Sequence, residues 1–182
     1  MRLGMSITSG YPGLDGTAAV GSLLERGRVA SQAGLDHLTL GDQHATGSFS
    51  YVQNVPAIGR IMADWPRDKP IGLLLLLPLW NPVIAAEQIG TLAAMSDAPF
   101  IVQTGIGSGA GQFDALGADL SSRGRITDAS ITAMKELFAG KQVTAPDFDI
   151  IDASISPRPP QPVEWWIGSG VAPAAIDRAA RE

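Results

Sequence analysis

Residues 72–82, GLLLLLPLWNP, form an apolar run with no polar alternation. A half-buried strand would alternate, and an amphipathic helix would show a polar residue at every third or fourth position. The run is also about half of the roughly 20 apolar residues that a membrane span requires. We therefore predict a strand buried on both faces, in a parallel sheet covered by helices or closed into a barrel, with Leu74, Leu75 and Leu76 inaccessible.

The rest of the chain alternates strand patterns with helix patterns. The other predicted strands cover residues 2–7, 37–41, 100–107 and 164–168. The predicted helices cover residues 17–32, 53–65, 82–95, 122–139 and 172–181. Most strand starts are separated by about the 30 residues of one strand–helix repeat. This order predicts an α/β fold with a parallel sheet, either a doubly wound open sheet or a (β/α)₈ barrel.

Helix ends carry their own signals. Thr17 is the predicted N-cap of the first helix, and Gly34 follows its C-terminus. Asn81 is predicted to cap the third helix, with Pro82 in its first turn. The apolar stripe of this helix is expected to consist of Ile84, Ile89, Leu92 and Met95.

Composition narrows the classes of partner. The 182 residues are 45% hydrophobic and 17% charged, which fits one domain, residues 1–182, with a covered core. The net charge is −5 and Lys and Arg do not cluster, which argues against nucleic acid and anionic membranes as partners. The absence of cysteine excludes disulfides and thiol chemistry. The N-terminus becomes polar too soon for a signal peptide, so we expect a cytoplasmic protein.

Glycine and short polar residues concentrate just after the predicted strands, in TSGYPG, GDQHATG, GIGSGAGQFDALG and GSGVAP. Parallel folds place ligands at the carboxyl ends of their strands. Small residues there let a flat ligand approach the backbone. We therefore expect the binding site at this edge of the sheet.

Four segments, in order, resemble the luciferase-like flavin monooxygenase family, which also includes oxidoreductases that use the deazaflavin coenzyme F-420. They are GLDHLTLGDQHATG, LLPLWNPVIAAEQIGTLAAMS, FIVQTGIGSG with the following FDALGADLSSRGRITDASITAMKELFAG, and ISPRPPQP with WWIGSG. The resemblance runs from residue 1 to residue 182. It implies a (β/α)₈ barrel, a cofactor that is FMN or coenzyme F-420, a small organic substrate, and a homodimer formed through the second and third helices.

The resemblance also implies site residues. Asp42 and His44 are the expected catalytic residues, because they lie where the family faces the reactive edge of the cofactor. The peptide between Leu74 and Leu75 is expected to be cis in the deazaflavin branch. The remaining expected cofactor contacts are Gly105, Gly107, Gln112, Gly168, Ser169 and Gly170. Gly168, Ser169 and Gly170 would aim backbone N–H groups at a phosphate ahead of the last helix.

Alternatives stand beside these residues. Residues 105–110, GIGSGA, fit a dinucleotide-binding fingerprint, but Asp128 falls in a predicted helix where the fingerprint requires an acid at a strand end. Tyr11 and Trp80 are equally readable as core residues or as stacking partners of a cofactor. His37 is expected to be structural, and two histidines on either side of a strand do not predict a metal site.

The sequence supplies five strands, whereas a closed barrel needs eight. We therefore expect a C-terminally truncated piece or a reduced relative of the barrel. Its last strand should expose a flat apolar edge at Trp165 and Trp166, and its cofactor affinity should be weak or absent. Reduced-flavin monooxygenation is the favoured function. Hydride transfer with the deazaflavin is one alternative, and a non-catalytic truncated barrel or flavin-binding relative is the other.

Overall fold

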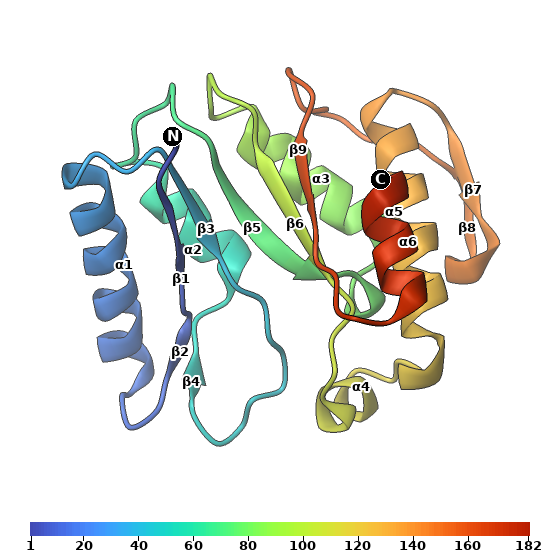
Figure 1. The fold of residues 1–182 in the computed structure, drawn as a ribbon, viewed down its shortest axis with the longest axis horizontal. Helices are drawn as coiled ribbons and strands as arrows, with labels where there is room; N and C mark the ends of the chain where they lie inside the picture. The colour runs from blue at the N-terminus through green and yellow to red at the C-terminus, as the bar shows by residue number, and fades with distance from the viewer.

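The computed structural model describes residues 1–182 and contains a five-stranded sheet in which all neighbouring strands are parallel (Figure 1). In sheet order the strands are β1 (Gly4–Ile7), β3 (His37–Leu40), β5 (Ile71–Leu76), β6 (Ile101–Gly105) and β9 (Glu164–Ile167). Their order in the sheet is their order in the chain. A doubly wound sheet reverses direction at a switch point, whereas a barrel adds each strand beside the last. The fold is therefore the partial (β/α) barrel that the sequence predicts.

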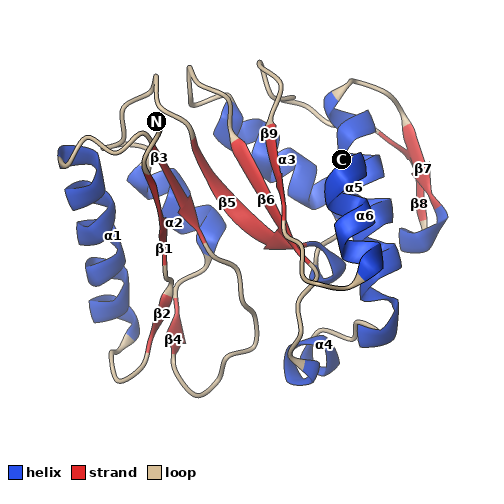
Figure 2. Cartoon of the chain, viewed as in Figure 1, coloured by secondary structure: helices blue, strands red, loops and turns tan.

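The longer helices follow the strands; the first four pack along one face of this curved sheet, and the last packs against the fourth (Figure 2). They are α1 (Gly16–Gln32), α2 (Asn54–Ile61), α3 (Pro82–Ala93), α5 (Arg123–Phe138) and α6 (Pro173–Arg181). Leu38, Leu73 and Val102 of the sheet share one buried cluster with Ile58 of α2 and Met134 of α5. Since side chains alternate along a strand, these residues define the outer, helix-covered face.

The inner face of the sheet is open, and it corrects the prediction for the leucine run. Leu75 is 1% exposed, but Leu74 and Leu76 are only half-buried. β1 and β9 each pair with a single neighbour, so five strands do not enclose the concave side. The leucine run has no polar alternation because the side chains on both faces of β5 are apolar, but the helices cover only the outer face.

Side chains nevertheless fill the N-terminal end of this inner face. The rings of His37 on β3 and Trp166 on β9 meet edge to face at 5.0 Å. Glu164 accepts a hydrogen bond of 2.9 Å from the Trp166 indole and lies 3.6 Å from the guanidinium of Arg2. The last strand therefore contacts His37 on the second strand of the sheet and Arg2 just before the first, so the sheet curls across its inner face. Trp166 is half-buried as a result, which corrects the expected flat apolar edge.

Trp165 points the other way and is also half-buried. It packs on Phe138 of α5, with ring centroids 6.2 Å apart, and the ammonium of Lys135 lies 5.6 Å from its ring. The last strand still has an unpaired edge, as predicted, but its tryptophans are not a free surface.

Two helix ends are as predicted and one is not. Asn81 caps α3 through the amides of Val83 and Ile84, and Gly34 follows α1 with a φ of 75°. The N-cap of α1 is Asp15, whose carboxylate accepts from the Ala18 amide, and not Thr17. The carboxylate is the stronger acceptor for an exposed helix amide.

The apolar stripe predicted for α3 is only partly correct. Ile89 and Leu92 are buried, but Ile84 and Met95 are about half exposed. The buried positions between them are the small residues Ala85, Ala86 and Gly90, which allow α3 to lie close to its neighbours. Gly90 is closely approached by the backbone of Pro157.

Short elements were not predicted from the sequence. They are β2 (Gly10–Tyr11), β4 (Ser50–Tyr51), α4 (Ala110–Ala115), β7 (Val143–Ala145), β8 (Ile150–Ala153) and the 3₁₀ turns Leu77–Leu79, Leu120–Ser122 and Pro146–Phe148. Elements of two to six residues carry too little periodicity to be recognised.

The peptide between Leu74 and Leu75 is trans, so the expected cis bond is wrong; the cis peptide of the chain is Ser156–Pro157. None of the helices has the length and apolar character that crossing a membrane would require.

Candidate functional site

Asp42 is the centre of a polar cluster at the carboxyl ends of the strands. It follows β3 after Gly41, and its side chain is fully buried. Its Oδ2 accepts hydrogen bonds of 2.8 Å from the Leu76 amide and from the indole of Trp80. One carboxylate oxygen thus connects the end of β3 to the end of β5 and to the turn that follows it.

His44 faces the other oxygen of this carboxylate. Its Nε2 lies 3.2 Å from Oδ1 of Asp42, and its side chain is 17% exposed. The contact has ion-pair distance without the alignment of a regular hydrogen bond, and neither atom has another partner. The pair lies just after the carboxyl end of β3, with the imidazole against the buried carboxylate; its catalytic role stays a prediction.

The loop after β6 reaches the same place. Oε1 of Gln112 accepts a long hydrogen bond, 3.4 Å, from the backbone amide of His44. Gly107 has a φ of 67°, which disfavours any residue with a side chain, and a Cβ there would crowd the ring of Phe113. Gly105 lies beside the Leu74 and Leu76 side chains of β5. The structure therefore brings Gly105, Gln112 and His44 to one end of the sheet.

Leu74 and Leu75 have different environments. The carbonyl of Leu74 accepts a hydrogen bond of 2.7 Å from Asn54 at the start of α2, and its side chain lies on the inner face. Leu75 points into the core beneath the helices. A ligand on the inner face could therefore contact the side chain of Leu74 but not that of Leu75, which is 1% exposed. The predicted role of these two residues in cofactor binding stays a prediction.

The segment Gly168–Gly170 is exposed, at the end of β9. The amide of Gly168 donates to the carbonyl of Thr104, so it is not free for an anion, and α6 begins only at Pro173. Ser169 and Gly170 lie in the intervening loop. Any phosphate contact here would involve those two residues and the start of α6.

The structure assigns three aromatic residues whose roles sequence reasoning missed or left open. Trp80 belongs to the site, with its ring 5.7 Å from that of His44, whereas Tyr11 is a core residue that is 5% exposed. Tyr51 lies beside the cluster: burial raises its pKa to about 12, and the negative charge of Asp42 adds to the shift. The short strand β4 that positions Tyr51 has no sequence signature, so the residue could not have been found from the pattern.

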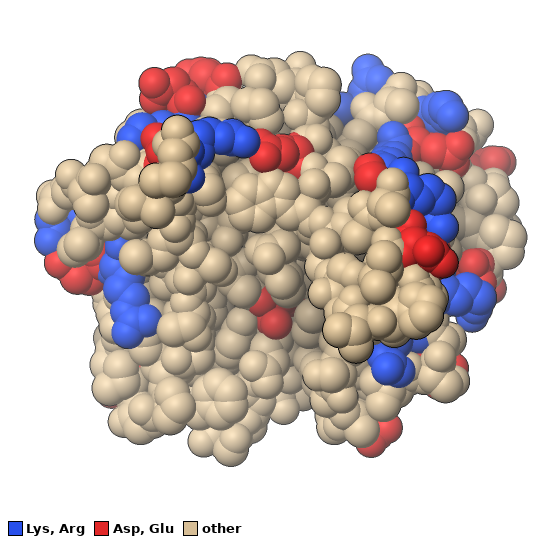
Figure 3. Space-filling model, viewed as in Figure 1, with Lys and Arg blue, Asp and Glu red and all other residues tan.

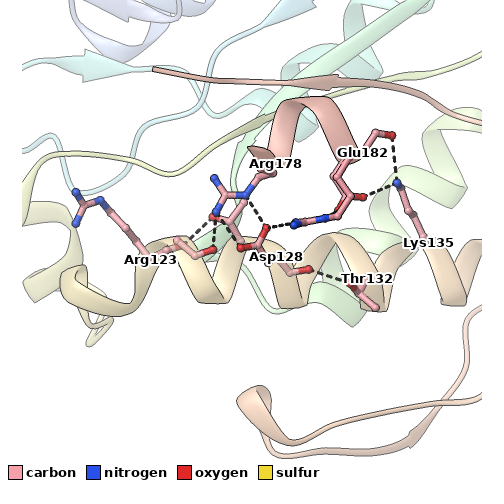
Figure 4. A network of polar contacts seen from close by, with 9 residues as sticks. Arg123, Asp128, Thr132, Lys135, Arg178 and Glu182 are labelled. Atoms are coloured by element: carbon pink, nitrogen blue, oxygen red, sulfur yellow. Dashed lines mark hydrogen bonds and ion pairs between the residues drawn. The ribbon is translucent and has the colours of Figure 1, made fainter. Parts of the chain in front are cut away.

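The structure does not support the alternative of a dinucleotide-binding fingerprint. Asp128 lies within α5 and not at the end of a strand, and its carboxylate pairs with Arg178 of α6, at 2.7 Å from Nε (Figure 4). His37 and His44 lie at opposite ends of β3, and no group of three His, Cys, Asp or Glu side chains could hold a metal ion.

The site suits a planar, uncharged ring. Leu74 and Leu76 supply an apolar surface on the inner face, and His44 and Gln112 supply polar edges. Glycines at positions 41, 105 and 107 let the side chains of Tyr51, Leu76 and Phe113 lie close to the backbone there. Figure 3 shows that the middle of this open face carries acidic atoms but no Lys or Arg.

Comparison with known proteins agrees with this architecture. The family model for luciferase-like monooxygenases matches residues 1–182. The monooxygenase RslO1 from Streptomyces bottropensis superimposes with a TM-score of 0.85 at 17% identity, covering 100% of this chain and 57% of that one. The oxygenating constituent of 3,6-diketocamphane monooxygenase from Pseudomonas putida, solved with FMN, gives a TM-score of 0.66 at 16% identity, covering 79% and 41%. Riboflavin lyase, solved with modified FMN and riboflavin, gives 0.73 at 13% identity, covering 96% and 51%.

The fold and site define a protein of the luciferase-like barrel class. The chain belongs to the luciferase-like monooxygenase family. Uncharacterized proteins of Mycobacterium tuberculosis and Mycobacterium bovis are 30% identical to it over 110 residues, which is 59% of this chain and 38% of theirs. The chain thus spans well under two thirds of the length of the relatives that it matches.

Proposed function

We propose that this chain contributes to an oxidoreductase that uses reduced FMN and oxygen to oxygenate a small organic molecule. The observation that supports it is the cluster at the strand ends, in which a buried Asp42 faces the half-buried His44 beside Trp80 and Gln112. The family and the FMN in two of the similar structures favour FMN as the cofactor. No feature of the chain specifically favours the deazaflavin.

Residues at different places on the inner face would contact different parts of the cofactor. Leu74, Leu76 and the glycines after β3 and β6 would hold the ring system, and Gln112 would contact its polar edge. Ser169 and Gly170 would lie at the phosphate end. When bound, reduced FMN supplies the electrons that activate oxygen.

His44 is the residue placed to move a proton. Its Nε2 lies 3.2 Å from the carboxylate of Asp42, so Nδ1 would be the nitrogen that exchanges a proton with a bound ligand. Asp42 acts through His44, because its own carboxylate is buried and already accepts from Leu76 and Trp80. The apolar leucines beside the pair reduce the access of water to the reacting group.

Titration of FMN with the purified chain, followed by quenching of flavin fluorescence, tests the proposal. We expect weak, saturable quenching, because the inner face is open along one side. His44→Ala should weaken it further, whereas His37→Ala, at the other end of the same strand, should not. No quenching at any concentration would favour the non-catalytic alternative. Submicromolar binding would show that five strands build a complete cofactor site.

We also propose that the protein is a homodimer formed through α2 and α3. The exposed Ile84 on α3 and Met95 just after its C-terminus support this, since large exposed apolar side chains favour a protein contact. The small residues of α3 would let a second helix approach closely.

A further inference from the structure

Tyr51 and Ser9 form a pair of hydroxyl-bearing residues beside Asp42. β2 and β4 pair Gly10 with Tyr51, and the Val52 amide donates to the carbonyl of Ser9 at 2.9 Å. This small sheet places Tyr51 next to the segment that follows β1. Two stretches about 40 residues apart in the sequence thereby meet beside Asp42.

Gly41 makes room for the phenol. A Cβ at Gly41 would come within 3.0 Å of the Tyr51 hydroxyl, so the phenol oxygen lies directly over the residue that precedes Asp42. A side chain at position 41 would displace it. The glycine in GDQH is therefore explained by the position of Tyr51 as well as by ligand access.

Ser9 lies behind this phenol. Its hydroxyl is sealed from solvent and has no aligned hydrogen-bond partner, although it is close enough to Tyr51 to partly offset the rise in the pKa of that residue. The Tyr51 hydroxyl, in contrast, is not sealed from solvent, and the residue as a whole is half-buried. It is the accessible member of the pair.

We propose that Tyr51 donates a hydrogen bond to a neutral oxygen of the organic ligand, a carbonyl or a hydroxyl, held beside His44, and that Ser9 positions the phenol. The ligand is called a substrate only on the basis of the proposed function; the binding itself requires no flavin. Tyr51 is a neutral donor at neutral pH, as tyrosine ordinarily is, and burial and the charge of Asp42 raise its pKa further. The same negative charge, without a Lys or Arg in the middle of the open face, disfavours an anionic ligand.

One other surface also involves Tyr51. Its ring lines an apolar groove of about 460 Å³ between α1 and α2, together with Val20 and Pro56. Trp80 does not line this groove. A signal from Trp80 therefore separates ligand at the strand ends from ligand in the groove.

The test uses acetophenone, with a neutral carbonyl, and benzoate, its anionic counterpart, without flavin. The four tryptophans give four indole N–H resonances, of which Trp80→Phe identifies one. We expect acetophenone to shift the Trp80 resonance saturably and benzoate to do so at least about tenfold more weakly. Tyr51→Phe should weaken acetophenone binding by about fivefold to tenfold, the cost of one hydrogen bond.

Tyr11→Phe is the matched control, because it removes the hydroxyl of the other tyrosine, which lies in the core. It should leave acetophenone binding unchanged. Gly41→Ala and Ser9→Ala should each weaken binding by displacing or loosening the phenol, so the proposal stays testable if Tyr51→Phe does not fold.

Four outcomes would overturn the proposal: no binding of acetophenone to the wild-type chain, equal affinity in Tyr51→Phe, preference for benzoate, or Tyr51-dependent binding that leaves the Trp80 resonance unmoved. FMN binding is measured separately and can fail while the acetophenone result stands. The two proposals are thus distinguished.

Discussion

Asp42 and Trp80 lie 38 positions apart in the chain, yet the indole Nε1 of Trp80 donates a hydrogen bond of 2.8 Å to the carboxylate of Asp42. The same oxygen accepts from the Leu76 amide. This contact links two neighbouring strand ends at the position where His44 meets the inner face. Much of the candidate site depends on it.

Replacing Asp42 by Ala should destabilise the fold, since it leaves the Leu76 amide and the Trp80 indole without their acceptor. We expect a loss of about 1–3 kcal/mol in the free energy of unfolding, measured by urea denaturation. Asp42→Asn retains one acceptor oxygen and should lose less. If both variants unfold like the wild-type chain, the carboxylate does not hold these strand ends together.

The two faces of β5 should respond differently to truncation. Leu75→Ala removes a buried side chain from the core and should cost about 2–5 kcal/mol. Leu74→Ala, on the open face, should cost less than half as much, because water already reaches that side chain. Guanidinium denaturation of the pair measures the difference. Equal losses would mean that the inner face is covered in solution.

Alanine substitutions at two glycines should distinguish an effect on the stability of the fold from an effect on cofactor binding. An alanine Cβ at Gly72 would collide with the backbone carbonyl of Ile101, which cannot move without breaking the sheet, so Gly72→Ala should fail to fold or lose several kcal/mol, about 3 or more. At Gly105 the nearest atom is the flexible end of Leu76, at 3.0 Å. Gly105→Ala should keep its melting temperature within a few degrees but quench FMN less. Unchanged quenching would remove Gly105 from the cofactor site.

The contact between α5 and α6 should depend on pH (Figure 4). Hydrogen bonds from Arg178 hold the pKa of Asp128 below its usual value, and the charges of Arg178 and Arg181 add to this. A lowered pKa in the folded state stabilises the fold above the unfolded value of about 3.9, and this stabilisation disappears as the pH falls through the folded value.

Asp128→Asn should therefore be less stable than the wild-type chain at pH 7, and the difference should shrink as the pH falls through the lowered pKa of Asp128 in the folded state. The difference should stay under about 1 kcal/mol, because the Asp128 side chain is 40% exposed. Arg178→Lys keeps the charge but loses the paired hydrogen bonds, and faster amide exchange in α6 should reveal this. A constant difference at all pH values would contradict the assignment to ionisation.

Light scattering should give twice the mass of one chain, with more than about 1,000 Å² of total surface buried between protomers. Ile84→Glu should convert the dimer to a monomer, whereas Val29→Glu, equally exposed but on α1, should not. A wild-type monomer would remove α2 and α3 as an interface.

The strands and helices of the repeat could be predicted because each has a periodic pattern of its own. Asn81 with Pro82 marks the start of α3, and the leucine run marks β5, independently of any distant contact. The placement of Asp42 and His44 after β3 likewise follows from chain order, since parallel strands share their carboxyl edge. Gln112 and Gly105 could be assigned to the same edge for this reason.

Only the tertiary structure decided which contacts form there. No local pattern indicates that Trp80 and Leu76 share one oxygen of Asp42, that Tyr51 stands over Gly41, or that Gly168 uses its amide in the sheet. The different burial of Leu74 and Leu75 also depends on how far the five strands curl. The sequence cannot indicate it, because leucines occupy both faces of β5. Local periodicity reports how a residue is buried by its own element, whereas hydrogen bonds between strand ends depend on register and curvature, which arise only when all the elements pack together.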